Sequence, residues 1–293
     1  MMRVLVTGGN GQLGTEVVRE FNRLGHEVLA PLPEEMDFLD PDGVAVRAAA
    51  LQADWIINCA AYTQVDRAES EPAQAITINR DSAGRLAGAA AETGGRMLHV
   101  STDFVFDGKQ SRPYREDDEP RPLSVYGRSK WEGDRAVLDT LPGAVILRTA
   151  WVYGVHGHNF VKTMLRVAGE GKPLRVVDDQ VGTPTWTADI VQAMVALVTA
   201  DASGVFHFTA AGETSWCGFA RAILEEAEQL GFDLKTRTVK AIPTSEYPTP
   251  ATRPQYSVLD TRKIELYLAS PIPPWRDSLV NMLKELQACA DCW

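Results

Sequence analysis

The stretch VLVTGGNGQLGTEVVREF, residues 4–21, decides the fold, because an apolar run, a glycine-rich turn and an amphipathic helical segment follow one another directly. Gly8, Gly11 and Gly14 stand in a GxxGxxG spacing. In such a turn one glycine permits the tight bend, one lets a pyrophosphate approach the backbone, and one allows close helix–strand packing. The N–H groups at the helix start then face the anion. We therefore predict a dinucleotide-binding unit, the alternative being a merely tight turn between strand and helix.

Short apolar runs alternate with Ala-rich helical stretches through the first two-thirds of the chain. The expected strands cover residues 3–8, 26–31, 54–61, 96–102, 144–154, 174–179 and 205–212. Strands that are almost continuously apolar and separated by helices indicate a parallel sheet covered on both faces. The pattern predicts the α/β class with a Rossmann-type, doubly wound parallel sheet.

The character of the sequence changes after about residue 213. A helical segment, residues 215–231, is expected to begin at Ser215 as N-cap and to end at Gly231. The proline-rich stretch IPTSEYPTPATRP, residues 242–254, then favours extended backbone. We expect a smaller C-terminal lobe folded over the carboxyl ends of the strands, where open α/β sheets bind ligands.

Composition limits the function classes. The 293 residues include 29 Lys and Arg against 39 Asp and Glu, a formal charge of −10. This balance argues against a general nucleic-acid binder, whose affinity comes mostly from neutralising phosphates. No run of about 18 apolar residues occurs, so no membrane span is expected. The N-terminal MMRVLVTGG lacks the features of a signal peptide, which predicts a cytoplasmic protein.

Two features bear on cofactor and metal. The second expected strand ends at Ala30 and Pro31, with neither a carboxylate at its tip for a ribose 2′-hydroxyl nor an arginine for a 2′-phosphate. NADPH and NADH therefore both stay open, with NADPH slightly favoured. Cys289 and Cys292 form CADC, but a second CxxC or a nearby histidine pair is missing, so no zinc site is predicted.

Two further segments follow the glycine-rich turn. VSTDFVFDG, residues 100–108, ends a strand with the hydroxyls of Ser101 and Thr102. In LSVYGRSK, residues 123–130, Tyr126 precedes Lys130 by four positions where a helical pattern begins. Such a pair alone is common on ordinary helices. A glycine-rich turn, a strand ending in Ser or Thr, and YxxxK in this order resemble the extended short-chain dehydrogenase/reductase superfamily.

The resemblance narrows further along the chain. The motifs that carry it include TGGNGQLGTE (7–16), AAYTQVDRAESEP (60–72), STDFVFDG (101–108), VYGRSKWEGDRA (125–136), DDQVGTPT (178–185) and YPTPATRP (247–254). Together they resemble the dTDP-4-dehydrorhamnose reductase family from residue 3 to about residue 283. This implies an NAD(P)-binding Rossmann domain over residues 1–155, with return segments near 174–212, and a lobe over residues 156–293 that mainly binds the sugar nucleotide.

The resemblance implies a reaction and roles for three residues. The family reduces dTDP-4-dehydro-6-deoxy-L-mannose to dTDP-L-rhamnose with hydride from NADPH or NADH. Tyr126 would donate the proton to the 4-keto oxygen. Lys130 would favour the phenolate of Tyr126 and reach the nicotinamide ribose. Thr102 would hydrogen-bond the same keto oxygen, the alternative being a strand-end hydroxyl that satisfies the backbone.

Binding residues follow from the same matching positions. The expected cofactor residues are Gly8, Asn10, Gly11, Gln12, Leu13, Gly14, Asp37, Phe38, Ala61, Tyr62, Thr63, Tyr126 and Lys130. The expected substrate residues are Thr102, Asp103, Trp151 and Arg253. Trp151 would offer an aromatic face to the 6-deoxy sugar, or be ordinary core. Arg253 would bind the diphosphate of the dTDP-sugar, or form a surface ion pair.

The sequence also departs from the family pattern. Phe104 follows STD where a tyrosine is expected in close relatives. Some relatives dimerise through a magnesium site that includes a glutamate of the first helix, and Glu16 matches it, but no partner carboxylate can be placed. A homodimer stays open, and Mg²⁺ is not expected. Two rival functions remain: reduction of another nucleotide 4-keto-6-deoxy sugar, and a non-catalytic NADP-binding regulatory subunit like that of methionine adenosyltransferase.

Overall fold

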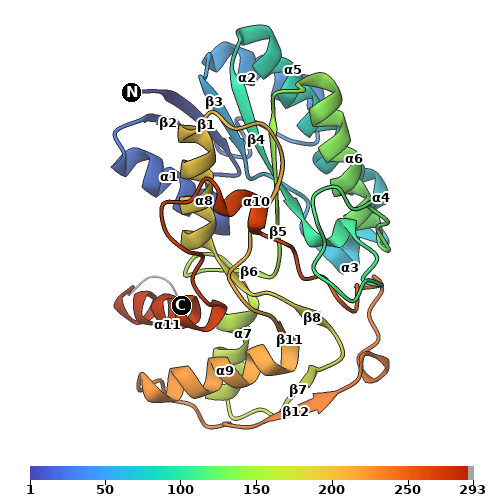
Figure 1. Ribbon diagram of the computed structural model, residues 1–293, viewed down its shortest axis with the longest axis vertical. Helices are drawn as coiled ribbons and strands as arrows, with labels where there is room; N and C mark the ends of the chain where they lie inside the picture. The colour runs from blue at the N-terminus through green and yellow to red at the C-terminus, as the bar shows by residue number, and fades with distance from the viewer. Residues whose placement is uncertain (290–293) are drawn as a thin grey trace.

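A six-stranded parallel sheet occupies the upper part of the molecule in Figure 1. The computed structural model describes residues 1–289, so Cys292 of the CADC sequence lies outside the described residues. The strands follow the order β10-β5-β4-β3-β1-β2. They are β1 (Arg3–Thr7), β2 (Glu27–Leu29), β3 (Trp55–Asn58), β4 (Arg96–Thr102), β5 (Val145–Thr149) and β10 (Gly204–His207). Every pairing in this sheet is parallel, which confirms the predicted α/β class.

Helices cover both faces of the sheet. On one face, α1 (Gln12–Arg23) and α8 (Thr187–Thr199) pack on strand residues such as Val4 and Val6. On the other face, α2 (Pro41–Leu51), α5 (Ala83–Thr93) and α6 (Val125–Thr140) pack on residues such as Leu5. Successive strand side chains point to opposite faces, so a strand buried on both sides must be apolar throughout. The continuous apolar runs in the sequence have this cause.

A second packed region lies below the sheet in Figure 1. Its helices are α7 (Phe160–Gly169), α9 (Trp216–Gln229) and α11 (Trp275–Ala288), which share one apolar core. A parallel pair, β7 (Leu174–Val177) and β12 (Val239–Ile242), packs against this core. The range 174–212 is therefore divided: β7 pairs with β12, whereas α8 and β10 return to the large sheet. Within residues 1–289, no helix has the length and apolar character needed to cross a membrane.

The remaining elements are short. They are α3 (Val65–Ala68), α4 (Pro72–Ile76), the π-helical turn η1 (Thr77–Ser82), the 3₁₀ turns η2 (Asp103–Val105) and η3 (Thr244–Glu246), α10 (Arg262–Glu265), and the two-residue strands β6 (Val152–Tyr153), β8 (Val181–Gly182), β9 (Thr185–Trp186) and β11 (Thr214–Ser215). Strand β11 pairs with β8, and β6 pairs with β9. Several of these elements border the cavity described next.

Candidate active site

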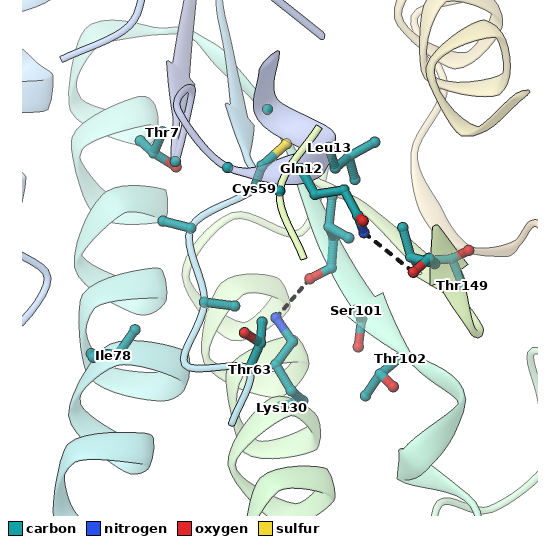
Figure 2. Close-up of a pocket in the computed structure, with 18 of the residues that line it drawn as sticks. Thr7, Gln12, Leu13, Cys59, Thr63, Ile78, Ser101, Thr102, Lys130 and Thr149 are labelled. Carbon is teal, nitrogen blue, oxygen red and sulfur yellow. Dashed lines mark hydrogen bonds between the residues drawn. The ribbon is translucent and has the colours of Figure 1, made fainter. Parts of the chain in front are cut away.

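A cavity of about 900 Å³ lies at the carboxyl ends of β1, β3, β4 and β5 (Figure 2). It is lined by residues from the glycine-rich turn, the loops after β2 and β3, the start of α6, and Trp216 at the start of α9. All of the binding and catalytic residues expected from the sequence line it, with one exception, Tyr62. Parallel strands bring their carboxyl ends to one edge, so segments far apart in the chain meet there.

The glycine-rich turn forms one side of the cavity. Gly8 has a φ of +66°, and a Cβ there would lie 2.8 Å from the backbone nitrogen of Ala60. At Gly14 a Cβ would lie 2.0 Å from the carbonyl oxygen of Gly8, so any side chain would separate helix and turn. Helix α1 begins at Gln12 without a side-chain cap, which leaves its first N–H groups free to bind an anion.

Gln12 links this turn to the second packed region. Its amide nitrogen donates to the carbonyl oxygen of Val152 at 3.2 Å, and its amide oxygen accepts from Asn159 at 2.8 Å. Asn159 is the N-cap of α7. The start of α1 and the start of α7 are therefore held together through one side chain.

The loop after β2 forms a mainly apolar wall. Pro31, Pro33, Met36, Phe38 and Leu39 line the cavity there, together with Asp37. None of the described cavity-lining residues on this wall is a lysine or arginine. The wall suits the flat faces of an adenine ring, and it offers a 2′-phosphate no cation of its own.

Tyr126, Lys130 and Thr102 meet on the wall formed by α6 and β4. Ser124 caps α6 by accepting a hydrogen bond from the Gly127 nitrogen at 3.1 Å, and Tyr126 lies in the first turn. Lys130 follows one turn later, on the same face. Thr102 is the last residue of β4, and its hydroxyl donates to a carboxylate oxygen of Asp103 at 3.1 Å. The three residues line one cavity, as the sequence predicts.

The electrostatics of this group differ from the sequence-based expectation. A lysine cation beside Tyr126 was expected to lower the tyrosine pKa, but burial raises the pKa of Tyr126 to about 12. Lys130 instead donates from Nζ to the carbonyl oxygen of Val100 at 2.6 Å, the hydrogen bond seen in Figure 2. Burial also lowers the pKa of Lys130 to about 8. At neutral pH the phenol therefore keeps its proton.

Asp103 and Phe104 complete the surroundings of Tyr126. Burial raises the pKa of Asp103 to about 6, although the Thr102 hydroxyl donates to the carboxylate. The Phe104 ring meets the Tyr126 ring edge-on, with centroids 5.6 Å apart. Phe104 thus supplies an apolar contact at the position where a tyrosine was expected.

An aromatic pair forms the far side of the cavity. Trp151, with a φ of +46°, stacks on Trp216 with ring centroids 3.7 Å apart and planes 9° apart. Both rings line the cavity. Trp151 was expected from the sequence as a site residue, whereas Trp216 was not. Trp216 directly follows the N-cap Ser215, so its position at the start of a helix could have been predicted.

Arg253 forms an ion pair and also lines the cavity. Its guanidinium donates to the two carboxylate oxygens of Asp66 at 3.0 and 2.8 Å, and to the hydroxyl of Thr249 at 2.6 Å. It also lines the main cavity and a neighbouring cavity of about 790 Å³. The ion pair with Asp66 therefore fixes the direction of the Arg253 guanidinium at the edge of the cavity.

Tyr62 does not line the cavity, but its hydrogen bonds fix the loop that follows β3. Its hydroxyl donates to Glu71 at 2.8 Å, and its backbone exchanges two hydrogen bonds with the Asn79 side chain, at 2.8 and 3.1 Å. Ala61 and Thr63 on either side line the cavity, whereas Tyr62 does not. Asn79 also donates to Ser129 at 2.9 Å, which ties this loop to α6. The sequence carries no signal for Asn79, because it lies inside a helical stretch.

Other cavity residues were not among the binding and catalytic residues expected from the sequence. They include Thr7, Cys59, Ala60, Val65, Ile78, Val100, Ser101, Thr149, Ala150, Val152, Gly157 and His158. Many of them follow directly from the rule that ligands bind at the carboxyl ends of parallel strands.

Glu16, which matches the magnesium ligand of some relatives, forms ion pairs within the chain. Its carboxylate is bound by Arg19 at 2.6 Å, and the same guanidinium binds Glu285 at 2.8 Å. Within residues 1–289, no group of three His, Cys, Asp or Glu side chains could hold a metal ion. A hard divalent cation needs several oxygen ligands. Arg19 occupies Oε2 of Glu16, while Oε1 is buried without a hydrogen-bond partner and lies 3.4 Å from His156 Nε2.

Comparison with known proteins places this site in a family. The family described as RmlD substrate binding domain matches residues 2–288. This chain belongs to that family. Its relatives include the dTDP-4-dehydrorhamnose reductase of Escherichia coli strain K12, 40% identical over 295 residues that cover 97% of this chain and 98% of the relative. The spore coat polysaccharide biosynthesis protein SpsK of Bacillus subtilis is 40% identical over 99% of this chain and 100% of its own length.

Solved structures named dTDP-4-dehydrorhamnose reductase share the fold. A dTDP-4-dehydrorhamnose reductase from Clostridium acetobutylicum superimposes with a TM-score of 0.92 at 38% identity, covering 98% of this chain and 100% of that one. The enzyme of the same name from Bacillus anthracis, in complex with NADP, gives a TM-score of 0.91 at 34% identity, covering 97% and 99%.

Proposed function

We propose that this protein reduces dTDP-4-dehydro-6-deoxy-L-mannose to dTDP-L-rhamnose with hydride from NADPH or NADH. One observation carries the proposal. Tyr126, Lys130 and Thr102 line the same cavity as the glycine-rich turn, in a chain 40% identical to proteins named dTDP-4-dehydrorhamnose reductase.

The reduction needs a proton at the sugar's 4-keto oxygen, and Tyr126 is the donor in this proposal. The reduced nicotinamide, when bound, supplies the hydride. With a pKa of about 12 before substrate binds, the phenol stays protonated at working pH. It gives up its proton as negative charge develops on the sugar oxygen, because an alkoxide is a stronger base than a phenolate. Thr102 holds the oxygen in line, and the Lys130 cation stabilises the phenolate that forms.

In this proposal the glycine-rich turn and the loop after β2 bind the cofactor. The open N–H groups of α1 bind the pyrophosphate, and Asp37 and Phe38 lie along the adenine. The relative from Bacillus anthracis was solved with NADP, which supports NADPH. The wall formed by the loop after β2 has no lysine or arginine to bind the 2′-phosphate of NADPH, so we also include NADH as a cofactor.

The substrate lies against the second packed region in this proposal. Trp151 presents its ring to the deoxysugar, Asp103 binds a sugar hydroxyl, and Arg253 binds the diphosphate. We divide the chain into residues 1–155, with return segments in 174–212, for the cofactor and residues 156–293 mainly for the sugar nucleotide. Trp216 and Arg253 line the same cavity as the glycine-rich turn, which supports this division.

The decisive experiment follows oxidation of NADPH with dTDP-4-dehydro-6-deoxy-L-mannose. We expect Tyr126→Phe to lower kcat by roughly 10²- to 10⁴-fold, the usual contribution of a positioned acid. Tyr247→Phe is the matched control, because Tyr247 is 58% exposed and does not line the cavity. Normal turnover by Tyr126→Phe would refute the assigned acid. A panel of other nucleotide 4-keto-6-deoxy sugars tests the substrate assignment.

A further inference from the structure

A row of buried polar side chains runs beneath the cavity from the glycine-rich turn to Lys130. Thr7, Asn58 and His99 are cross-strand neighbours on β1, β3 and β4. The Thr7 hydroxyl donates to the Asn58 amide oxygen at 2.6 Å, and the Asn58 amide nitrogen lies 2.8 Å from His99 Nδ1. His99 Nε2 lies 3.2 Å from Lys130 Nζ. Each of these four side chains belongs to a residue that is at most 2% exposed.

The row has two self-consistent proton arrangements. If the Asn58 amide donates to Nδ1, the neutral imidazole carries its proton on Nε2, which faces Lys130. An Nε2–H and an ammonium are both donors, so this arrangement requires a neutral Lys130 amine. If the amide is turned over, Nδ1–H donates to its oxygen, and the amide nitrogen donates to the Thr7 hydroxyl. Nε2 then accepts from the Lys130 ammonium. The structure has the amide in the first orientation, so the second requires the amide to turn over. The two arrangements differ by one solvent proton on Lys130.

Charged and titratable groups reach this position from every neighbouring element. Asp134 lies one turn further along α6, its carboxylate 4.0 Å from His99 Nε2 and 3.2 Å from the guanidinium Nε of Arg148 on β5. Cys59 follows β3, and Tyr126 precedes Lys130 on α6. Burial raises the pKa of the Cys59 thiol to about 12 and lowers that of His99 well below its usual range. Both groups are therefore neutral at working pH, and Lys130, with a pKa of about 8, is the group that changes charge there.

We propose that His99 is a positioning residue for Lys130: its Nδ1–H tautomer accepts a hydrogen bond from the Lys130 ammonium and holds this cation at the cavity. When Lys130 loses its proton, the imidazole changes to the Nε2–H tautomer. The inference rests on the proposed function only in giving Lys130 a role in the reduction. The hydrogen bonds of the row do not depend on the proposed function.

The first test is the pH profile of kcat/KM. His99→Leu removes the acceptor of the ammonium, so the pKa of Lys130 falls. We expect the alkaline limb to move to lower pH by about one unit, the effect of a tenfold loss in preference for the charged form. His99→Gln, whose amide oxygen can accept at the Nε2 position, should return the alkaline limb of the kcat/KM profile to its wild-type pH. His207→Leu is the matched control, because His207 is equally buried in β10 but outside the cavity.

The second test needs no substrate and therefore stands apart from the proposed function. Nitrogen-15 NMR of histidine-labelled protein, assigned with His99→Gln, reports the tautomer from about pH 6 to about pH 10. We expect His99 to be protonated on Nδ1 at the lower pH and on Nε2 at the higher pH, without becoming a cation. A single tautomer across this range would overturn the proposal. So would an alkaline limb that His99→Leu and His207→Leu leave equally unchanged.

Discussion

Trp151 lies directly against Gly182: a Cβ added at position 182 would come within 2.6 Å of Cε2 of the Trp151 indole. Trp216 stacks on the same indole at a centroid distance of 3.7 Å. Trp151 also holds a φ of +46°, a conformation that a bulky side chain rarely adopts. The ring therefore packs against both Trp216 and Gly182, and its position depends on the absence of a side chain at residue 182.

Gly182→Ala should displace the indole and weaken substrate use. We expect KM for the dTDP-sugar to rise by about tenfold, since overpacking typically costs about 1 to 3 kcal/mol. The affinity for NADPH, measured by fluorescence titration, should stay the same. Gly88→Ala is the control, because a Cβ there meets only a methyl group, 3.8 Å away. An unchanged KM in Gly182→Ala would show that the indole does not contact the sugar.

Asp103→Asn should make the protein more stable and less active. The folded-state pKa of Asp103 is about 6, above the ordinary 3.8, so folding favours the protonated form. The cost of the buried carboxylate is absent below about pH 4 and grows as pH rises through 6, to on the order of 2 to 3 kcal/mol. The free energies of unfolding of wild type and variant, from urea titrations, should diverge across this range. Parallel curves would contradict the raised pKa.

Arg253→Lys should raise KM for the dTDP-sugar by about tenfold with little change in kcat. A lysine keeps the charge but cannot make both hydrogen bonds to Asp66, so the cation loses its fixed direction. Arg276→Lys is the matched control, because Arg276 binds Glu225 and Glu226 and does not line the cavity. Equal kinetics for the two variants would leave Arg253 as an ion pair without a binding role.

Removal of divalent metal ions should change neither activity nor oligomeric state. Glu16 is bound to Arg19, which supplies the positive charge that a magnesium ion would bring. Steady-state kinetics and size-exclusion chromatography after treatment with EDTA check this expectation. Activity that is lost with EDTA and restored by Mg²⁺ would contradict it.

Much of the cavity could be predicted because it follows local rules. The turn at Gly8 is a strand–turn–helix pattern, and Thr102 and Tyr126 lie at a strand end and a helix start. The side-chain direction of Tyr62 could not be predicted, because a loop has no fixed periodicity and the Glu71 and Asn79 contacts decide it. His99 lies within an apolar strand, so the sequence pattern gives no functional signal for it.

Other features depend on contacts between distant segments. The stacking of Trp151 on Trp216 requires knowing where α9 begins relative to β5, which no local pattern contains. The raised pKa of Tyr126 likewise depends on burial and on the direction in which Lys130 points. Spacing alone indicated that the two residues share a helix face, and it could not show that the lysine bonds to β4.

The return of α8 and β10 to the large sheet has a consequence for how the chain can be cut. A fragment that stops at residue 155 would leave β5 as an unpaired edge and expose the face on which Phe21, Val145 and Leu147 are buried. During synthesis, this face stays uncovered until residues 187–207 have emerged and folded back. The large sheet therefore cannot be completed before α7 and β7 of the second region have been made, so a cut at residue 155 divides a single folding unit.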